Sequence, residues 1–302
     1  MDMTSRRARS VCYICMILAA AIWGAAFVAQ KMTAEHMGAF TYNGVRFAMG
    51  SVALIPVILL LEKPDKSKTR RTWLMGTAGG AVLFTATNLQ QVGIILSDSD
   101  TAASEAGFIT GLYIVLVPIF GLAVGRKAGV MTWIGAVVAF AGLAVISIGP
   151  DGVGAIRMTD LTLVLCAVFF AVHILLIDRF VKDINPIRFA SIQFATSAVL
   201  STVCALSFEN VLNLSSLRGI WAGILPLLFC GILSSSGAYT LQILGQRGVE
   251  PSKAAIIMSL EALFAALSEA IWYKVLMEPR VLIGGALIFA AIMLSQIKGK
   301  VR

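Results

Sequence analysis

The chain has 302 residues, of which 58% are hydrophobic and only 13% are charged, and its mean hydropathy is +0.88. A soluble domain is about 45–50% apolar and about 25% charged, so this composition excludes a water-soluble enzyme or binding domain. The formal net charge is +8, but the basic residues lie in short connections and tails. That placement is typical of topology determinants beside anionic lipid and not of a nucleic-acid interface.

Ten apolar segments follow one another with short connections, and each is long enough to cross a bilayer as a helix. In chain order they span about residues 11–30, 40–61, 73–96, 101–122, 131–149, 160–177, 187–208, 220–244, 252–272 and 281–297. The first segment is longer than the apolar core of a signal peptide, so we expect an uncleaved first helix. The sequence therefore predicts an all-α polytopic membrane protein with ten transmembrane helices.

The basic residues also predict an orientation. Of the 24 Lys and Arg, seventeen lie in the two tails and in the connections on the same side of the membrane, whereas five lie in connections on the other side. Because positive residues are retained in the cytoplasm, we expect both termini to be cytoplasmic. The expected location is a cell membrane, with the bacterial inner membrane favoured.

An internal repeat divides the predicted helices into two sets of five. A shift of 147 residues places Trp23 on Phe170 and Phe47 on Phe194, and a shift of 152 places Gln90 on Gln242. Because five is odd, the second set must enter the membrane from the opposite side. The prediction is two inverted five-helix repeats, residues 1–150 and 151–302, which is a transporter architecture with a site near the midplane.

Several loose motifs occur in a fairly specific order: Ala21-Ile22-Trp23-Gly24, Arg46-Phe47, Gly107-Phe108-Ile109-Thr110-Gly111-Leu112-Tyr113 with Pro118, Ser259-Leu260-Glu261-Ala262-Leu263-Phe264-Ala265-Ala266, and Leu282-Ile283-Gly284. In these motifs the chain resembles the drug/metabolite transporter superfamily, EamA-type, over essentially its full length. The resemblance implies a central cavity lined chiefly by the first, third, fourth, sixth, eighth and ninth helices. It also implies transport of small metabolites, often outward.

The chain departs from the pattern of that family at three positions. Arg126 and Val275 stand near places where relatives usually carry Glu at the ends of the fourth and ninth helices. Ala262 follows Glu261 where Pro is usual. A gating role that depends on those residues in relatives is therefore not carried over to this chain.

Uncharged polar residues inside the membrane mark two further helices. The segment 220–244 and the residues after it carry a stripe at helical spacing, formed by Ser235, Tyr239, Gln242 and Gln246. The repeat mate of this segment, 73–96, carries Thr87, Asn88, Gln90 and Gln91. Lipid cannot satisfy amides and hydroxyls, so we expect these groups to face inward. They either bind substrate or join helices, and Gln90 and Gln242 are favoured for binding because they recur across the repeat.

Three acids lie within apolar segments: Glu105 in 101–122, and Glu261 and Glu269 in 252–272. An ionisable group in hydrocarbon costs at least ~2.5 kcal/mol, which makes it a functional-site hypothesis. Glu105 and Glu261 could each exchange a proton during transport, and for Glu105 the alternative is a structural ion pair with a Lys or Arg. Glu269 lies near the outer end of its segment, where we expect it to pair with Lys274 or to reach the headgroups. Glu261 is the stronger candidate because it lies deeper in its segment.

Four other residues complete the candidate set. Trp23 is expected to form a cavity wall or to pack between helices, and Tyr113 is a candidate substrate contact within its motif. His173 is either a proton relay or a hydrogen-bonded packing residue. Arg46 is expected to reach outward to the membrane surface or to answer an acid, and a substrate-carboxylate site is the further alternative.

These features favour a secondary transporter that moves a small organic metabolite by alternating access. The buried acids favour an amino-acid-like zwitterion or a cation and coupling to protons, and the resemblance implies outward movement. The alternatives are a membrane-embedded enzyme on a lipid-linked substrate, which the two histidines and the lack of an HExxH motif disfavour, and a channel. No catalytic residue, cofactor, metal or nucleic acid is expected. The expected partners are the solute and the bilayer, with monomer and homodimer both open.

Overall fold

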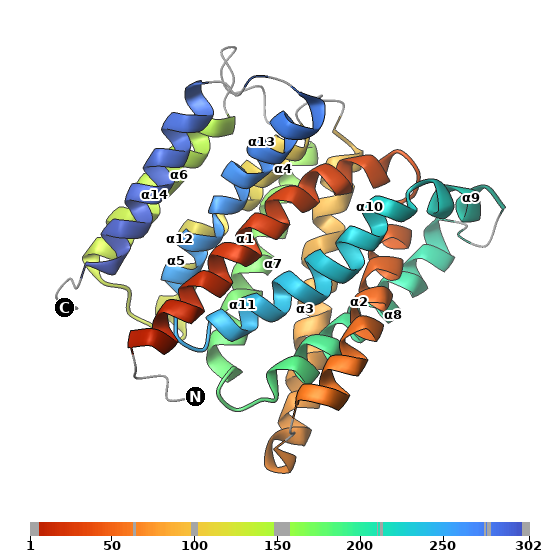
Figure 1. Cartoon of the computed structure of the whole chain (residues 1–302), viewed down its shortest axis with the longest axis horizontal. Helices are drawn as coiled ribbons and strands as arrows, with labels where there is room; N and C mark the ends of the chain where they lie inside the picture. Colours follow the sequence, from red (N-terminus) through yellow and green to blue (C-terminus); the bar gives the residue numbers. More distant parts are fainter. Residues whose placement is uncertain are drawn as a thin grey trace.

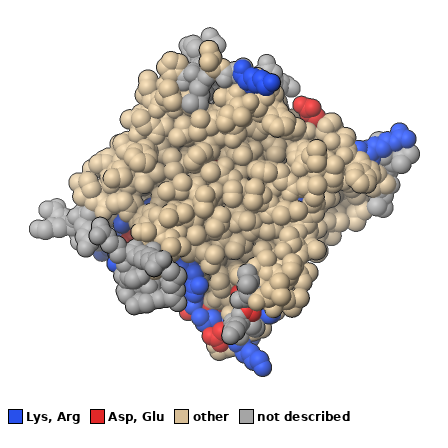
Figure 2. Space-filling model, viewed as in Figure 1, with Lys and Arg blue, Asp and Glu red and all other residues tan. Residues whose placement is uncertain are grey.

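A computed structural model describes residues 6–62, 65–97, 102–147, 158–209, 211, 214–274, 276 and 279–297. Within these ranges the chain is helical apart from short connections and contains no strand. Eight helical spans there are long and apolar enough to cross a membrane, and Val130–Ile146 is a shorter apolar helix. Figure 2 shows a broad uncharged face with Lys, Arg, Asp and Glu at its margins. The predicted all-α polytopic membrane fold is confirmed.

The first five expected segments fall on α1 (Arg6–Ala34), α2 (Ala39–Leu61), α3 (Thr69–Ile95), α4 (Ala102–Thr110) with α5 (Tyr113–Ala123), and α6 (Val130–Ser147). A 3₁₀ turn, η1 (Lys66–Lys68), precedes α3. The other five fall on α7 (Met158–Phe180), α8 (Pro186–Phe208), α9 (Leu214–Ala222) with α10 (Ile224–Leu228), η2 (Phe229–Tyr239) and α11 (Thr240–Gly245), α12 (Pro251–Met258) with α13 (Leu260–Tyr273), and α14 (Pro279–Gln296). The expected boundary between repeats, 150/151, lies outside the described residues.

Repeat mates pack directly against each other, and they run antiparallel. The Ser51 hydroxyl of α2 donates to the carbonyl oxygen of Ser191 in α8 at 3.0 Å. Gly44, earlier in α2, faces Thr202, later in α8. Phe47 and Phe194, which coincide under the repeat shift, stack with ring centroids 5.7 Å apart. Antiparallel mates that meet at equivalent residues are what an inverted repeat requires.

The second pair of mates, α6 and α14, lies side by side at one edge of the molecule (Figure 1). A Cβ atom added to Gly142 would lie 2.7 Å from the carbonyl oxygen of Gly284, and one added to Gly284 would lie 2.5 Å from that of Gly142. Such close approach of two backbones requires small residues, as in other membrane helix pairs.

Two acids also join α2 and α8, one at each end of the pair. Each acid directly follows one helix and caps the start of the other. Glu209, after α8, accepts backbone N–H bonds from Phe40 at 2.8 Å and Thr41 at 2.7 Å. Glu62, after α2, accepts the backbone N–H bond of Ile187 at 3.2 Å. The two acids coincide under the shift of 147 residues. A carboxylate at a helix N-terminus satisfies orphan donors and complements the helix dipole.

Two segments expected to be continuous helices are interrupted near their middle. The segment 101–122 is broken at Gly111 and Leu112, where tight i→i+3 bonds replace helical ones, as in the 3.0 Å bond from Ile114 N–H to the Gly111 carbonyl. Pro118 follows within α5 and removes a further backbone donor. The segment 252–272 is broken at Ser259, between α12 and α13.

The segment expected at 220–244 is also irregular, because its middle, η2, is a π-helix and not an α-helix. The side chains show the wider turn, since the Ser235 hydroxyl donates at 2.9 Å to the carbonyl oxygen of Cys230, five residues earlier. π-helical segments are rare and occur frequently at functional sites. A face read with α-helical spacing therefore loses its register here.

Candidate substrate cavity

A cavity lies between the two halves, where the interrupted helices and η2 meet α1, α2, α3 and α7. Its volume is about 40 Å³, enough for a few water molecules. A metabolite would therefore require its lining to move apart. Seven of the expected site residues line it: Trp23, Gln90, Tyr113, His173, Tyr239, Gln242 and Glu261.

Two other expected residues are buried behind the lining. The Asn88 amide donates to the Ser201 hydroxyl at 3.1 Å, and its oxygen accepts from Asn43 at 3.1 Å. The Gln91 amide donates to the carbonyl oxygen of Gln30 at 3.3 Å. Both residues join helices, which was the alternative to substrate binding. The tenth residue, Glu105, has a side chain that lies outside the described residues.

Aromatic rings form one wall of the cavity. The Trp23 and Tyr239 rings meet edge to face with centroids 4.8 Å apart, and Tyr239 meets His173 in the same manner at 6.0 Å. The Trp23 indole N–H donates to the carbonyl oxygen of Ser234 at 3.3 Å. Phe170, the repeat mate of Trp23, lines the cavity as well, so the two halves contribute equivalent aromatic positions.

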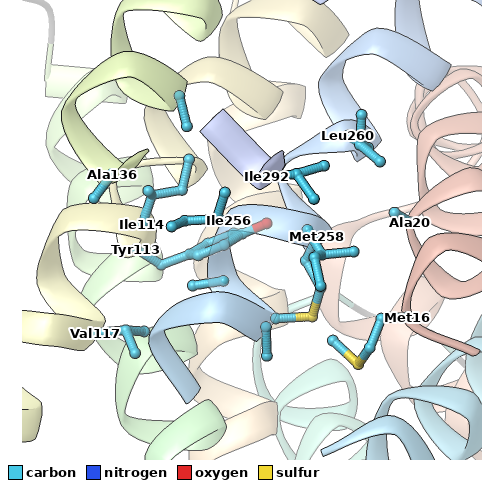
Figure 3. Close-up of a cluster of buried hydrophobic side chains, with 14 of the residues drawn as sticks. Met16, Ala20, Tyr113, Ile114, Val117, Ala136, Ile256, Met258, Leu260 and Ile292 are labelled. Atoms are coloured by element: carbon cyan, nitrogen blue, oxygen red, sulfur yellow. The ribbon is translucent and has the colours of Figure 1, made fainter. Parts of the chain in front are cut away.

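Glu261 is the acid of the cavity, and its side chain is held by the other half of the protein. It lies in the first turn of α13, directly after the break at Ser259, and is 6% exposed. The Tyr113 hydroxyl at the start of α5 donates to Glu261 Oε1 at 2.9 Å. Figure 3 shows the Tyr113 ring beside Ile256 within the buried apolar cluster. Within the described chain no basic residue pairs with Glu261.

The amides around the cavity are only partly satisfied. The Gln90 amide donates to the Thr110 hydroxyl at 3.3 Å. Its repeat mate, Gln242, is 2% exposed and its Oε1 has no hydrogen-bond partner among the described residues. His173 Nε2 lies 3.0 Å from Gln193 Oε1, whereas His173 Nδ1 is unpartnered. Buried polar atoms without partners are costly, so Gln242 Oε1 and His173 Nδ1 are free for a ligand.

The expected polar stripe of 220–246 reaches the cavity only in part, because η2 changes its register. Ser234 lines the cavity in place of Ser235. Gln246 turns away and donates to the carbonyl oxygen of Ile174 at 2.9 Å. Of the stripe, Tyr239 and Gln242 face the cavity. The spacing of the polar residues in the sequence did not indicate the π-helix.

Arg46 also lines the cavity, which corrects the expectation that it reaches outward. It is 3% exposed, and its Nη1 donates to the Tyr42 hydroxyl at 2.8 Å. Its guanidinium carbon lies 5.1 Å and 4.5 Å from the ring centroids of Tyr42 and Phe47. No carboxylate of the described chain pairs with it, so the expected alternative of an ion pair with an acid is not found there either.

No group of three or more His, Cys, Asp or Glu lies close enough to hold a metal ion in the part of the chain that the structure describes. The cavity instead offers amides, a phenol, a carboxylate, a guanidinium and aromatic faces. These groups bind small organic molecules by hydrogen bonds, charge and stacking.

The fold and this cavity define a helical membrane protein whose two inverted halves enclose a central site, which is the architecture of a membrane transporter. The EamA-like transporter family model matches the chain twice, over residues 10–148 and 157–296, and the chain belongs to that family. An uncharacterized transporter of Archaeoglobus fulgidus is 28% identical over 287 residues, which cover 94% of this chain and 85% of the relative. A crystal structure with 18% sequence identity has a TM-score of 0.78 and covers 95% of this chain and 97% of that one.

Proposed function

We propose that the protein is a secondary transporter that exports a small zwitterionic or cationic metabolite, coupled to protons, by alternating access of its two halves. The observation that carries this proposal is the buried carboxylate of Glu261, held at 2.9 Å by Tyr113 of the opposite half. A cationic group of the solute and a proton would compete for this carboxylate. Opening the halves would separate the two residues and so link binding to movement.

The interrupted helices support this mechanism. Transporters with inverted repeats place their sites at discontinuous helices, and here Tyr113 begins α5 and Glu261 lies in the first turn of α13. No GxxxxGK[ST] motif is present in the sequence, so the proposed energy source is a gradient. The outward direction rests on the resemblance to the superfamily alone.

The proposed location is a bacterial inner membrane with both termini in the cytoplasm. Seventeen of 24 Lys and Arg support this orientation. Single cysteines at Lys127 and Lys274, placed in a cysteine-free background, would be labelled from opposite faces of intact cells by an impermeant reagent. Labelling of Lys274→Cys from the outside is expected, and outside labelling of Lys127→Cys instead would reverse the proposed orientation.

The main test is solute-driven proton movement in proteoliposomes across a panel of amino acids, amines, sugars and nucleosides. We expect saturable uptake with proton movement in the wild type and loss of proton movement in Glu261→Gln. Glu269→Gln is the matched control, because Glu269 lies on the same helix but does not line the cavity. Solute uptake without proton movement, equal in Glu261→Gln, would show a facilitator or exchanger. Non-saturating flux would show a channel.

A further inference from the structure

The Arg46 side chain carries a buried charge that has no carboxylate partner among the described residues. Its guanidinium is always protonated in proteins, it is 3% exposed, and its Nε has no hydrogen-bond partner within those residues. It contacts the Tyr42 hydroxyl and the faces of the Tyr42 and Phe47 rings. Burying a charge is unfavourable unless it is paired, so an anion that enters the cavity would complete this site.

The equivalent position in the second half shows that the fold itself does not need a charge here. The shift of 147 residues places Arg46 on Gln193, which is 0% exposed and lies 3.0 Å from His173 through its Oε1. A neutral amide with a protein partner therefore fills the same place in the repeat. The Arg46 charge therefore occurs in one half of the cavity and not in the other. Such a difference between the halves suits a ligand that carries different chemical groups at its two ends.

The opposite charge of the same cavity is Glu261. Both Arg46 and Glu261 line it, together with Tyr239. Gln242 Oε1 adds an unpartnered acceptor to the lining. The cavity thus offers a planar cationic fork suited to a carboxylate and acceptors suited to an ammonium group.

We infer that Arg46 is the carboxylate-binding residue of the cavity, and that the transported solute is a zwitterion with its ammonium group at Glu261. This inference rests on the proposed transport function and narrows its substrate class, since a simple cation would leave the Arg46 guanidinium without an anionic partner. The aromatic and apolar lining from Trp23, Phe170 and Met258 favours a solute with an apolar side chain.

The test uses three probes that differ in one charge: L-leucine, L-leucinamide, which lacks the carboxylate, and 4-methylpentanoate, which lacks the ammonium group. Binding is measured as ligand-induced thermal stabilisation of the purified protein, and transport is measured in proteoliposomes. We expect the wild type to prefer L-leucine over L-leucinamide by about 30- to 4000-fold, the range for loss of one partner of a buried charge pair. A wild type that treats the two probes equally would overturn the inference.

The variant Arg46→Gln installs the residue of the repeat mate. We expect it to lose the preference for L-leucine over L-leucinamide, and we expect Arg46→Lys to keep part of it. A merely structural role would lower both affinities together and leave their ratio unchanged. Arg188→Gln is the control, because Arg188 pairs with Glu62 at 3.2 Å outside the cavity, and its ratio should equal that of the wild type.

The outcomes separate this inference from the proposed function. If simple amines are transported and Glu261→Gln abolishes that transport, but no carboxylate preference exists, the Arg46 assignment is wrong and the transporter stands. If no probe of the panel is bound or moved by the wild type, both fail together. If Arg46→Gln does not fold, the wild-type preference and the Arg46→Lys ratio still decide.

Discussion

The Tyr113 hydroxyl and the Glu261 carboxylate form a 2.9 Å hydrogen bond between the two halves, directly after a break in each parent helix. Removal of the hydroxyl by Tyr113→Phe leaves the packed ring in place. A hydrogen bond to a charged group contributes about 1.5–3 kcal/mol, so transport efficiency should fall by about tenfold to a hundredfold. Initial rates of solute uptake at several concentrations measure this loss.

Tyr13→Phe is the control for that substitution. The Tyr13 hydroxyl donates to Gln296 Oε1, and Tyr13 does not line the cavity. Its removal should leave the transport efficiency within about twofold of the wild type, because this hydroxyl is not part of the cavity. Equal losses in the two variants would show that the Tyr113 hydroxyl acts on stability and not on the site.

The two acids that cap α2 and α8 differ in the number of bonds they accept, and their variants should differ accordingly. Glu209 accepts two backbone N–H bonds and the Thr41 hydroxyl at 2.7 Å, whereas Glu62 accepts one backbone N–H bond at 3.2 Å and pairs with Arg188 at 3.2 Å. Loss of a helix N-cap costs about 0.5–2 kcal/mol. We expect Glu209→Ala to lower the melting temperature more than Glu62→Ala, measured in the same detergent. The reverse order would contradict the capping role of Glu209.

Much of the fold follows from the sequence, because hydropathy and breakers mark the helices and the odd number of helices per repeat fixes their inversion. The Phe47–Phe194 stack and the antiparallel α2–α8 contact then follow from the repeat. The break at Ser259 and the π-helix η2 do not follow, since no glycine or proline adjoins Ser259 and π-helical segments are too rare to be expected.

The candidate site was predicted where a polar group has no structural reason to be in lipid, as for Glu261, Gln90 and Gln242. The sequence did not place Arg46 in the site, because its side chain could point either outward to the membrane surface or inward to the cavity. Arg46 lies near enough to the end of α2 for an outward side chain, and only the packing of Tyr42 and Phe47 around its guanidinium shows that it turns inward.

The glycine contact between α6 and α14 predicts a strong effect from a small change. A methyl group at Gly142 or Gly284 would meet the backbone of the other helix at 2.5–2.7 Å, so the helices must separate. We expect Gly142→Ala and Gly284→Ala each to destabilise the protein by about 1–3 kcal/mol, as overpacking does. In Gly237→Ala the nearest atom would lie at 3.6 Å, and its unfolding midpoint should match the wild type. A common midpoint for all three variants would refute the close contact.

The α2–α8 crossing predicts which contact between the halves persists during transport. Ser51 Oγ and Ser191 Oγ lie 3.2 Å apart, about one turn along α2 from Phe47, whose ring stacks on that of Phe194. Because α2 and α8 pack against each other along much of their length, we expect them to stay in contact while the other helices of the two halves move. In a background without the five native cysteines, Ser51→Cys with Ser191→Cys should form a disulfide, since the side-chain atoms are within reach, and should still transport solute. Loss of transport on oxidation that reductant restores would instead show that α2 and α8 must separate in each cycle.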